Sequence, residues 1–119
     1  KKQWPFLNKT LSMVDIPRFN IQKYNIGGHF AELHTERENT STMHRVFAWM
    51  TYLNNVDDGG NTYFTHYDLR IKPEIGKTFI WPAEWTHAHC GEVLKSGIKV
   101  FVGRQRTHEI CCKHDSRNI

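Results

Sequence analysis

Short segments with alternating hydrophobic and polar residues, separated by turn residues, make up most of the chain from Phe19 onward. Residues 19–24 (FNIQKY) alternate with period 2, and the Asn-Ile-Gly-Gly sequence at 25–28 then ends the pattern. Further apolar, aromatic or β-branched segments lie at residues 45–53, 62–64, 69–72, 78–81, 86–89 and 98–102. Turn signals separate them at residues 57–60, 73–76, 82–83 and 95–97. Only residues 8–13 suggest a short helical turn.

Many short strands with little helix are typical of an all-β sandwich or barrel. We therefore predict a mainly β fold, a jelly roll (double-stranded β-helix) built from two facing sheets. The 119 residues contain no repeat and no Gly/Ser linker, and this length suits one domain with one core. We expect a single domain over residues 1–119, with residues 105–119 as a C-terminal tail.

Composition and charge exclude several classes of protein. With 39% hydrophobic and 24% charged residues, the chain has the composition of a globular domain rather than a disordered one. No apolar run is long enough to span a bilayer, so no membrane partner is expected. The net charge of +4 comes from scattered basic residues, which disfavours nucleic acid as a partner. Three cysteines, two of them adjacent, argue against a disulfide framework and favour a reducing, cytoplasmic setting.

Eight histidines are the most informative part of the composition. His34 and Glu36 stand two residues apart, so on a strand their side chains would leave the same face and could reach one ion. The segment Thr-His-Ala-His at 86–89 offers His87 or His89 as a further ligand. Two histidines and one carboxylate form the facial triad of non-haem Fe(II) oxygenases, in which the remaining metal positions are open. Taken alone, the His-x-Glu pattern is also compatible with polar residues on an edge strand.

Longer motifs narrow this interpretation. The chain contains R-V-F-A-W-M-T-Y-L-N-N-V-D-D-G-G-N-T-Y-F from Arg45, followed by I-K-P-E-I-G-K-T-F-I-W and H-C-G-E-V-L-K-S-G-I-K. In this order the segments resemble the prolyl 4-hydroxylase-like branch of the 2-oxoglutarate- and Fe(II)-dependent dioxygenases. The resemblance extends from about Phe19 to Val102 and is greatest to oxygenases carried by marine phages and bacteria.

The resemblance implies a metal site. His34 and Glu36 occupy the positions of the first histidine and the carboxylate of the family's motif, and His89 that of the second histidine. His89 has the family's spacing because Lys99 follows it by ten residues, whereas His87 does not. Glu36 stands where most members carry aspartate, so the carboxylate is one methylene further from the backbone.

The resemblance also implies a pocket for the cosubstrate. Lys99 would pair with the distal carboxylate of 2-oxoglutarate, and the hydroxyl of Tyr52 would reach the same carboxylate. Tyr24 and Thr62 match other positions that line the pocket. Arg45 occupies the position of an arginine near the substrate entrance, and we consider it the candidate catalytic residue of the chain.

The implied function is hydroxylation with Fe(II), 2-oxoglutarate and O2, with ascorbate as an accessory reductant, and with release of succinate and CO2. The expected substrate is a prolyl or other side chain of a peptide or protein, or a small molecule, in the cytoplasm of a bacterium or of a phage-infected host. A nucleic-acid demethylase is disfavoured, because that branch carries arginine rather than lysine on the cosubstrate carboxylate. The alternative is a non-catalytic, cupin-type jelly roll in which His87 and His89 chelate a metal together.

The family's helices before the first strand have no counterpart of comparable length here. Only about 18 residues precede Phe19. The resemblance therefore describes either a minimal member without the N-terminal bracing helices or a fragment.

Overall fold

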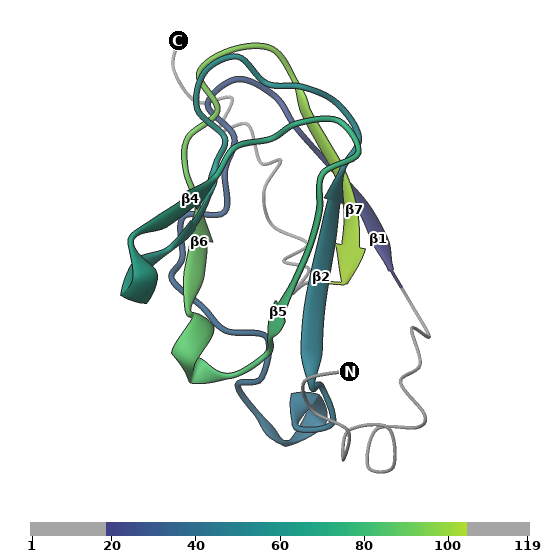
Figure 1. The fold of residues 1–119 in the computed structure, drawn as a ribbon, viewed down its shortest axis with the longest axis vertical. Coiled ribbons are helices and arrows are strands. Elements are labelled where there is room, and N and C mark those ends of the chain that lie inside the picture. Colours follow the sequence, from purple (N-terminus) through teal and green to yellow (C-terminus); the bar gives the residue numbers. More distant parts are fainter. Residues whose placement is uncertain (1–18, 105–119) are drawn as a thin grey trace, which may run out of the picture.

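A computed structural model of the chain describes residues 19–104 (Figure 1). The predicted helical turn at 8–13 and the tail at 105–119 lie outside these residues. Within them the elements follow in the order β1 (Asn20–Tyr24), η1 (Thr40–Thr42), β2 (Phe47–Tyr52), β3 (Thr62–Phe64), η2 (Thr65–Tyr67), β4 (Leu69–Ile71), β5 (Thr78–Pro82), η3 (Trp85–His87), β6 (His89–Gly91) and β7 (Lys99–Arg104), where η denotes a 3₁₀ helix.

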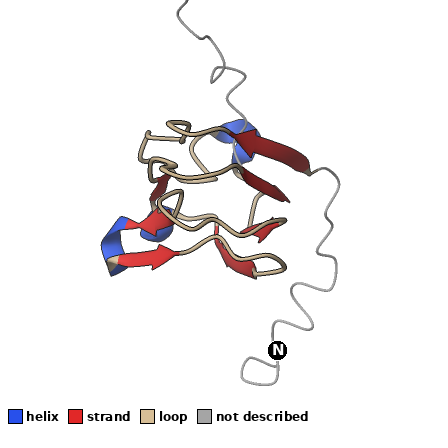
Figure 2. Ribbon diagram, turned by 90° about the horizontal axis from the view of Figure 1, so that it is seen from above, coloured by secondary structure: helices blue, strands red, loops and turns tan. Residues whose placement is uncertain are grey.

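The strands form two antiparallel sheets. The larger has the order β1-β7-β2-β5, and the smaller has the order β4-β3-β6. Figure 1 shows β4 and β6 on one side of the molecule and the larger sheet on the other, and Figure 2 shows that helical residues are confined to short turns. The predicted mainly β jelly roll with little helix is confirmed. None of the helical segments in residues 19–104 is long or apolar enough to cross a membrane.

The core lies between the two sheets and follows from the alternation along β2. Ala48, Met50 and Tyr52 point inward and are buried, while the intervening side chains point outward. In register with them, Phe79 lies opposite Met50 and Phe101 opposite Tyr52. The buried cluster that results consists of Ala48, Met50, Tyr52, Phe64, Trp81 and Phe101.

One predicted strand, and one segment considered as if on a strand, differ from the structure. Residues 85–87 form a 3₁₀ turn, in which the amide of His87 donates to the carbonyl of Glu84 at 3.0 Å, and strand β6 begins only at His89. The segment 34–36 is not a strand either, because His34 makes a single bridge and the chain then bends. The hydroxyl of Thr35 donates to the carbonyl of Arg37 at 3.2 Å, which turns the chain away from the sheet.

The packing predicts which aromatic residue joins the sheets. Phe64 is 3% exposed and contacts Trp81 across the core, at 5.5 Å between ring centroids. Phe64→Ala should lower the free energy of unfolding by about 3–5 kcal/mol, because it removes a buried ring and leaves a cavity. Ile80→Ala is the control, since Ile80 is 67% exposed, and it should cost less than about 1 kcal/mol. Urea unfolding followed by fluorescence measures both; equal losses would show that the core is wrongly located.

Candidate metal centre and anion pocket

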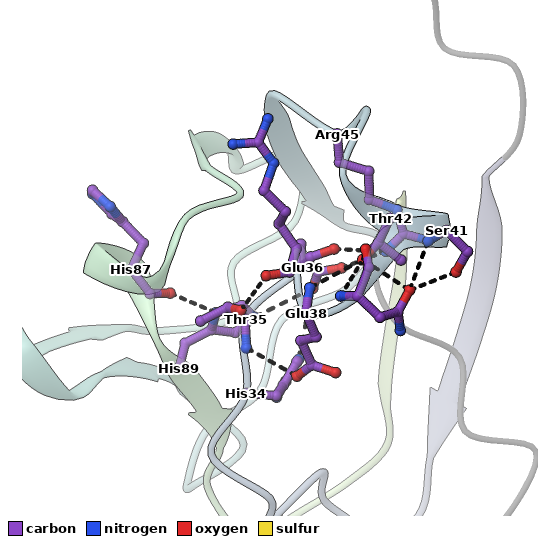
Figure 3. A network of polar contacts seen from close by, with 11 residues as sticks. His34, Thr35, Glu36, Glu38, Ser41, Thr42, Arg45, His87 and His89 are labelled. Atoms are coloured by element: carbon purple, nitrogen blue, oxygen red, sulfur yellow. Dashed lines mark hydrogen bonds and ion pairs between the residues drawn. The ribbon is translucent and has the colours of Figure 1, made fainter.

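Three buried side chains converge at one end of β6. His34, Glu36 and His89 each offer a ligand atom, and these atoms lie within 4.8 Å of one another. Oε1 of Glu36 is 3.6 Å from Nε2 of His34 and 3.5 Å from Nε2 of His89 (Figure 3). The structure thus brings together all three residues that the sequence suggests as metal ligands. The ring of His87 is not part of this cluster.

Backbone carbonyls orient both imidazoles. Nδ1 of His34 lies 2.9 Å from the carbonyl of Glu32, and Nδ1 of His89 lies 2.9 Å from the carbonyl of His87. A carbonyl oxygen only accepts hydrogen bonds, so Nδ1 carries the proton in each ring. In the neutral ring each Nε2 therefore directs its lone pair toward Glu36, which is the arrangement that carbonyl partners impose on metal-binding histidines.

Two buried polar atoms of the cluster lack a hydrogen-bond partner, which is what a cation-binding site would leave. Oε1 of Glu36 and Nε2 of His89 are buried without a hydrogen-bond partner. Burial by itself raises the pKa of Glu36, but in the metal-free chain His34 and His89 outweigh it when their rings carry a positive charge, and they lower the pKa to about 2. A carboxylate that stays ionised beside two imidazole lone pairs is a suitable donor set for a divalent metal ion.

The distances also suit one ion. Imidazole nitrogens and carboxylate oxygens lie about 2.0–2.2 Å from a divalent metal such as zinc, so two ligands at angles of about 90–110° lie about 3.0–3.4 Å apart. The 3.5 and 3.6 Å separations around Oε1 are close to this range. Both separations that involve Oε1 therefore suit ligands of a single metal ion.

Arg45 contacts the carboxylate of the cluster. Its Nη1 donates to Oε2 of Glu36 at 3.2 Å and to the backbone carbonyl of Glu36 at 3.1 Å. Sequence reasoning located Arg45 near the substrate entrance and did not include this contact. Arg45 is not among the residues that line the pocket described next.

A pocket connects the cluster to Lys99. Its lining includes Tyr24, Thr62 and Lys99 as well as the rings of His34 and His89. Lys99 is 6% exposed, and its Nζ donates to the carbonyl of Gly60 at 2.6 Å. No carboxylate within residues 19–104 pairs with this ammonium, and burial lowers the pKa of Lys99 to about 8. A buried cation without a counter-ion favours an anionic ligand.

The two tyrosines have different positions relative to this pocket. Tyr24 lines it, with its ring stacked on Phe101 at 5.9 Å between centroids and its hydroxyl donating to Gln22 at 3.1 Å. Tyr52 is fully buried and does not line the pocket, and its hydroxyl shares a 2.7 Å hydrogen bond with the pocket residue Thr62. Burial, partly offset by this bond, raises the pKa of Tyr52 to about 12, so the phenol stays protonated. Of the two, Tyr24 lies where it can touch a ligand, whereas Tyr52 contacts Thr62.

Sequence reasoning missed the backbone groups that position these side chains. The carbonyl of Gly60 holds Lys99, and the Gly59-Gly60 pair adopts positive φ angles of 75° and 68°. A Cβ on Gly59 would come within 2.2 Å of the carbonyl of Val93, so the turn requires glycine there. The Asp-Asp-Gly-Gly sequence signalled a turn, but nothing in it indicated that the turn would hold Lys99.

Comparison with known proteins identifies the family of this chain. The family model described as "2OG-Fe(II) oxygenase superfamily" matches residues 19–111. The chain belongs to the 2OG-Fe(II) oxygenase superfamily. A search of curated protein sequences gives no significant match for this oxygenase-superfamily chain.

Solved structures share the fold of this superfamily member. The viral collagen prolyl hydroxylase of Paramecium Bursaria Chlorella virus-1, solved as a 2OG complex, is 23% identical with a TM-score of 0.55 over 86% of this chain and 66% of its own. A Pseudomonas putida prolyl-4-hydroxylase is 18% identical with a TM-score of 0.62 over 89% of this chain and 61% of its own. The chain thus spans somewhat less than two thirds of the length of these proteins.

The unpaired Lys99 predicts a specific dependence of stability on pH. Because its pKa is about 8 in the folded chain and about 10.5 when exposed, the unfolded chain binds more protons between these values. The contribution of Lys99 to the free energy of unfolding should therefore rise by about 3 kcal/mol from pH 8 to pH 10.5. Urea unfolding of wild type and Lys99→Met across this range isolates the contribution. A difference between the two proteins that does not change with pH would contradict it.

Proposed function

We propose that this domain is an Fe(II)- and 2-oxoglutarate-dependent dioxygenase that hydroxylates a side chain of a peptide or protein. The observation that carries the proposal is the single pocket that joins a buried His/Glu/His cluster to a buried, unpaired lysine. A ligand that fills this pocket must be able to bind a metal at one end and carry a negative charge at the other. 2-Oxoglutarate, with a 2-oxo acid group and a distal carboxylate, has this chemistry.

The metal end belongs to His34, Glu36 and His89. These residues would supply one carboxylate oxygen and two imidazole nitrogens to the ion, whose remaining positions would be open to oxygen ligands from the cosubstrate and to O2. The carbonyls of Glu32 and His87 hold the imidazole rings in the tautomer that binds metal. The buried position of all three ligands excludes bulk water from this side of the ion.

The opposite end belongs to Lys99. Its ammonium would form an ion pair with the distal carboxylate, which would add a charge-assisted bond to its contact with the Gly60 carbonyl and its approach to the Tyr52 and Phe101 rings. Thr62 lines the pocket with a hydroxyl, and the buried Tyr52 fixes that hydroxyl from behind at 2.7 Å. Tyr24 closes the pocket on the side of β1 through its contact with Phe101.

With metal and cosubstrate bound, O2 would convert 2-oxoglutarate to succinate and CO2 while one oxygen atom enters the substrate as a hydroxyl group. The residues of this chain bind, orient and shield these reactants. Ascorbate is included as the reductant that restores Fe(II) after unproductive turnover.

A prolyl side chain is the first substrate to test. Its support is the likeness of fold to two proteins named as prolyl hydroxylases. The test is succinate production from 2-oxoglutarate with Fe(II) and ascorbate, over a panel of proline-containing peptides, peptides without proline, and free amino acids. We expect succinate above background with at least one peptide and a mass gain of one oxygen atom on it. Binding of metal and 2-oxoglutarate without any succinate, with or without substrate, would contradict the proposal.

Metal binding distinguishes this proposal from the cupin-type alternative. His34→Ala should abolish one-to-one Mn(II) binding measured by isothermal titration, because it removes one of three ligands. His87→Ala should bind Mn(II) as wild type does, since only the backbone carbonyl of His87 reaches the cluster. Loss of binding in His87→Ala with retention in His34→Ala would support paired chelation by His87 and His89 instead.

Cosubstrate binding should depend on the charge of Lys99. Lys99→Met removes the cation and leaves a desolvated carboxylate unpaired, which costs about 3–5 kcal/mol and should raise the Kd for 2-oxoglutarate more than a hundredfold. Mn(II) should still bind, because Lys99 is not a ligand. Lys95→Met is the control: Lys95 is an exposed cation that makes only a 4.0 Å contact with Asp58, and its loss should leave both affinities unchanged. An unchanged Kd in Lys99→Met would overturn the assignment.

A further inference from the structure

We propose that Arg45 is a positioning residue: it hydrogen-bonds Oε2 of Glu36, so that this glutamate binds the metal through Oε1 alone. The inference rests on the proposed metal site. It concerns the denticity of the carboxylate and the reason that a glutamate, rather than a shorter acid, serves as the ligand.

The two oxygens of Glu36 have different partners. Oε2 accepts a hydrogen bond from Nη1 of Arg45 at 3.2 Å, whereas Oε1 faces the two Nε2 atoms at 3.6 and 3.5 Å. A metal ion between the imidazoles therefore meets Oε1 first. In bidentate binding Oε2 would have to share its charge between the metal ion and Arg45, which would weaken its bond to the guanidinium.

The same nitrogen of Arg45 also fixes the backbone. Nη1 donates to the carbonyl of Glu36 at 3.1 Å, so Arg45 contacts both the main chain and the end of the side chain of this residue. The carboxylate is thereby held at a fixed reach from its own Cα. Aspartate is shorter by one C–C bond, about 1.5 Å, and could not reach both Arg45 and the two imidazoles from this backbone position. The length of Glu36 is what spans the two partners.

A compact turn holds Arg45 in place. Thr42 accepts hydrogen bonds at its hydroxyl from the amides of Glu38 and Asn39, and the side chain of Asn39 accepts from the amide of Ser41 (Figure 3). The amide of Arg45 then donates to the carbonyl of Thr42 at 3.0 Å. These bonds fold residues 38–45 back over Glu36, which is why a residue nine positions later in the chain can contact it.

Burial makes the pair effective. The side chain of Glu36 is 1% exposed and that of Arg45 is 21% exposed, so solvent screens the contact weakly. Nε of Arg45 is buried without a partner, so the guanidinium is only partly compensated for the water that it has lost. Such a cation gives little net stability and is better explained by its effect on Glu36.

The test measures metal binding as well as turnover in the full chain. Arg45→Met should weaken Mn(II) binding by about 10–100-fold, as expected when the partner of a metal ligand is removed. The visible spectrum of bound Co(II), which depends on coordination number, should change because Oε2 becomes free to bind. Arg45→Lys keeps the charge and should restore part of the affinity. In turnover assays kcat should fall, whereas the KM for 2-oxoglutarate should stay as in wild type.

Arg37→Met is the matched control. Arg37 lies in the same loop, where its side chain pairs with Glu84 and donates to the carbonyl of Met43, but it does not bond to the Glu36 carboxylate. It should leave Mn(II) affinity and the Co(II) spectrum unchanged. Wild-type affinity and an unaltered Co(II) spectrum in Arg45→Met would overturn the inference.

A double-mutant cycle covers the case in which Arg45→Met fails to fold. Glu36→Asp should weaken Mn(II) binding in the wild-type background and have a smaller additional effect beside Arg45→Lys, because the two changes disturb the same contact. Additive effects would overturn the inference.

The outcomes separate this inference from the proposed function. A wild-type chain that binds no divalent metal would overturn both. A chain that binds metal, responds to Arg45 as described and yet makes no succinate would overturn the dioxygenase proposal and leave the role of Arg45 supported.

Discussion

The site depends on an antiparallel bridge between His34, which lies outside the named strands, and His89, the first residue of β6. The amide of His34 donates to the carbonyl of His89 at 3.1 Å, and the amide of His89 donates back to the carbonyl of His34 at 2.9 Å. This reciprocal pair joins the segment before η1 to the smaller sheet and brings the two imidazole rings to 4.4 Å between centroids. Together with the bond from the amide of Gly91 to the carbonyl of Phe30 at 2.7 Å, it holds two histidines from distant parts of the chain side by side, next to Glu36.

The two sheets set the distance between the two ends of the pocket, His89 at one end and Lys99 at the other. β6 begins at His89 in the smaller sheet, whereas β7 begins at Lys99 in the larger one. Inward alternation along β7 points Lys99 and Phe101 toward the core, and the Gly60 carbonyl fixes the ammonium at the end of its long side chain. His89 of the His/Glu/His cluster and the Lys99 cation are therefore held by different sheets and line one cavity. The packing of the core, rather than any local motif, sets their separation.

The sequence predicted the strands well because their signal is local. Alternation and turn residues located β3 and β4 within a residue, since side-chain periodicity and backbone conformation are read over a few positions. The segment 86–89 was assigned to a strand because Thr-His-Ala-His alternates, but a bond from His87 to Glu84 closes a 3₁₀ turn there. That bond depends on the path of the chain after Pro82, which alternation does not encode.

The candidate site was predictable to a different extent for each residue. His34, Glu36 and His89 follow from motif spacing, and the structure brings them together. The contact between Arg45 and Glu36 does not, because it arises from the turn at residues 38–45 and from the length of two flexible side chains. For the same reason, the fully buried position of Tyr52 behind Thr62 appears only once the sheets are packed.

The central claim is that one ligand joins the His/Glu/His cluster to Lys99 across the pocket. A crystal structure of the chain with Mn(II) and 2-oxoglutarate, grown without oxygen, tests it most directly through the anomalous scattering of manganese. The account predicts one peak at coordination distance from Nε2 of His34, Oε1 of Glu36 and Nε2 of His89, with the distal carboxylate of 2-oxoglutarate within hydrogen-bond distance of Nζ of Lys99. A manganese peak elsewhere, or a cosubstrate whose distal carboxylate points away from Lys99, would contradict it.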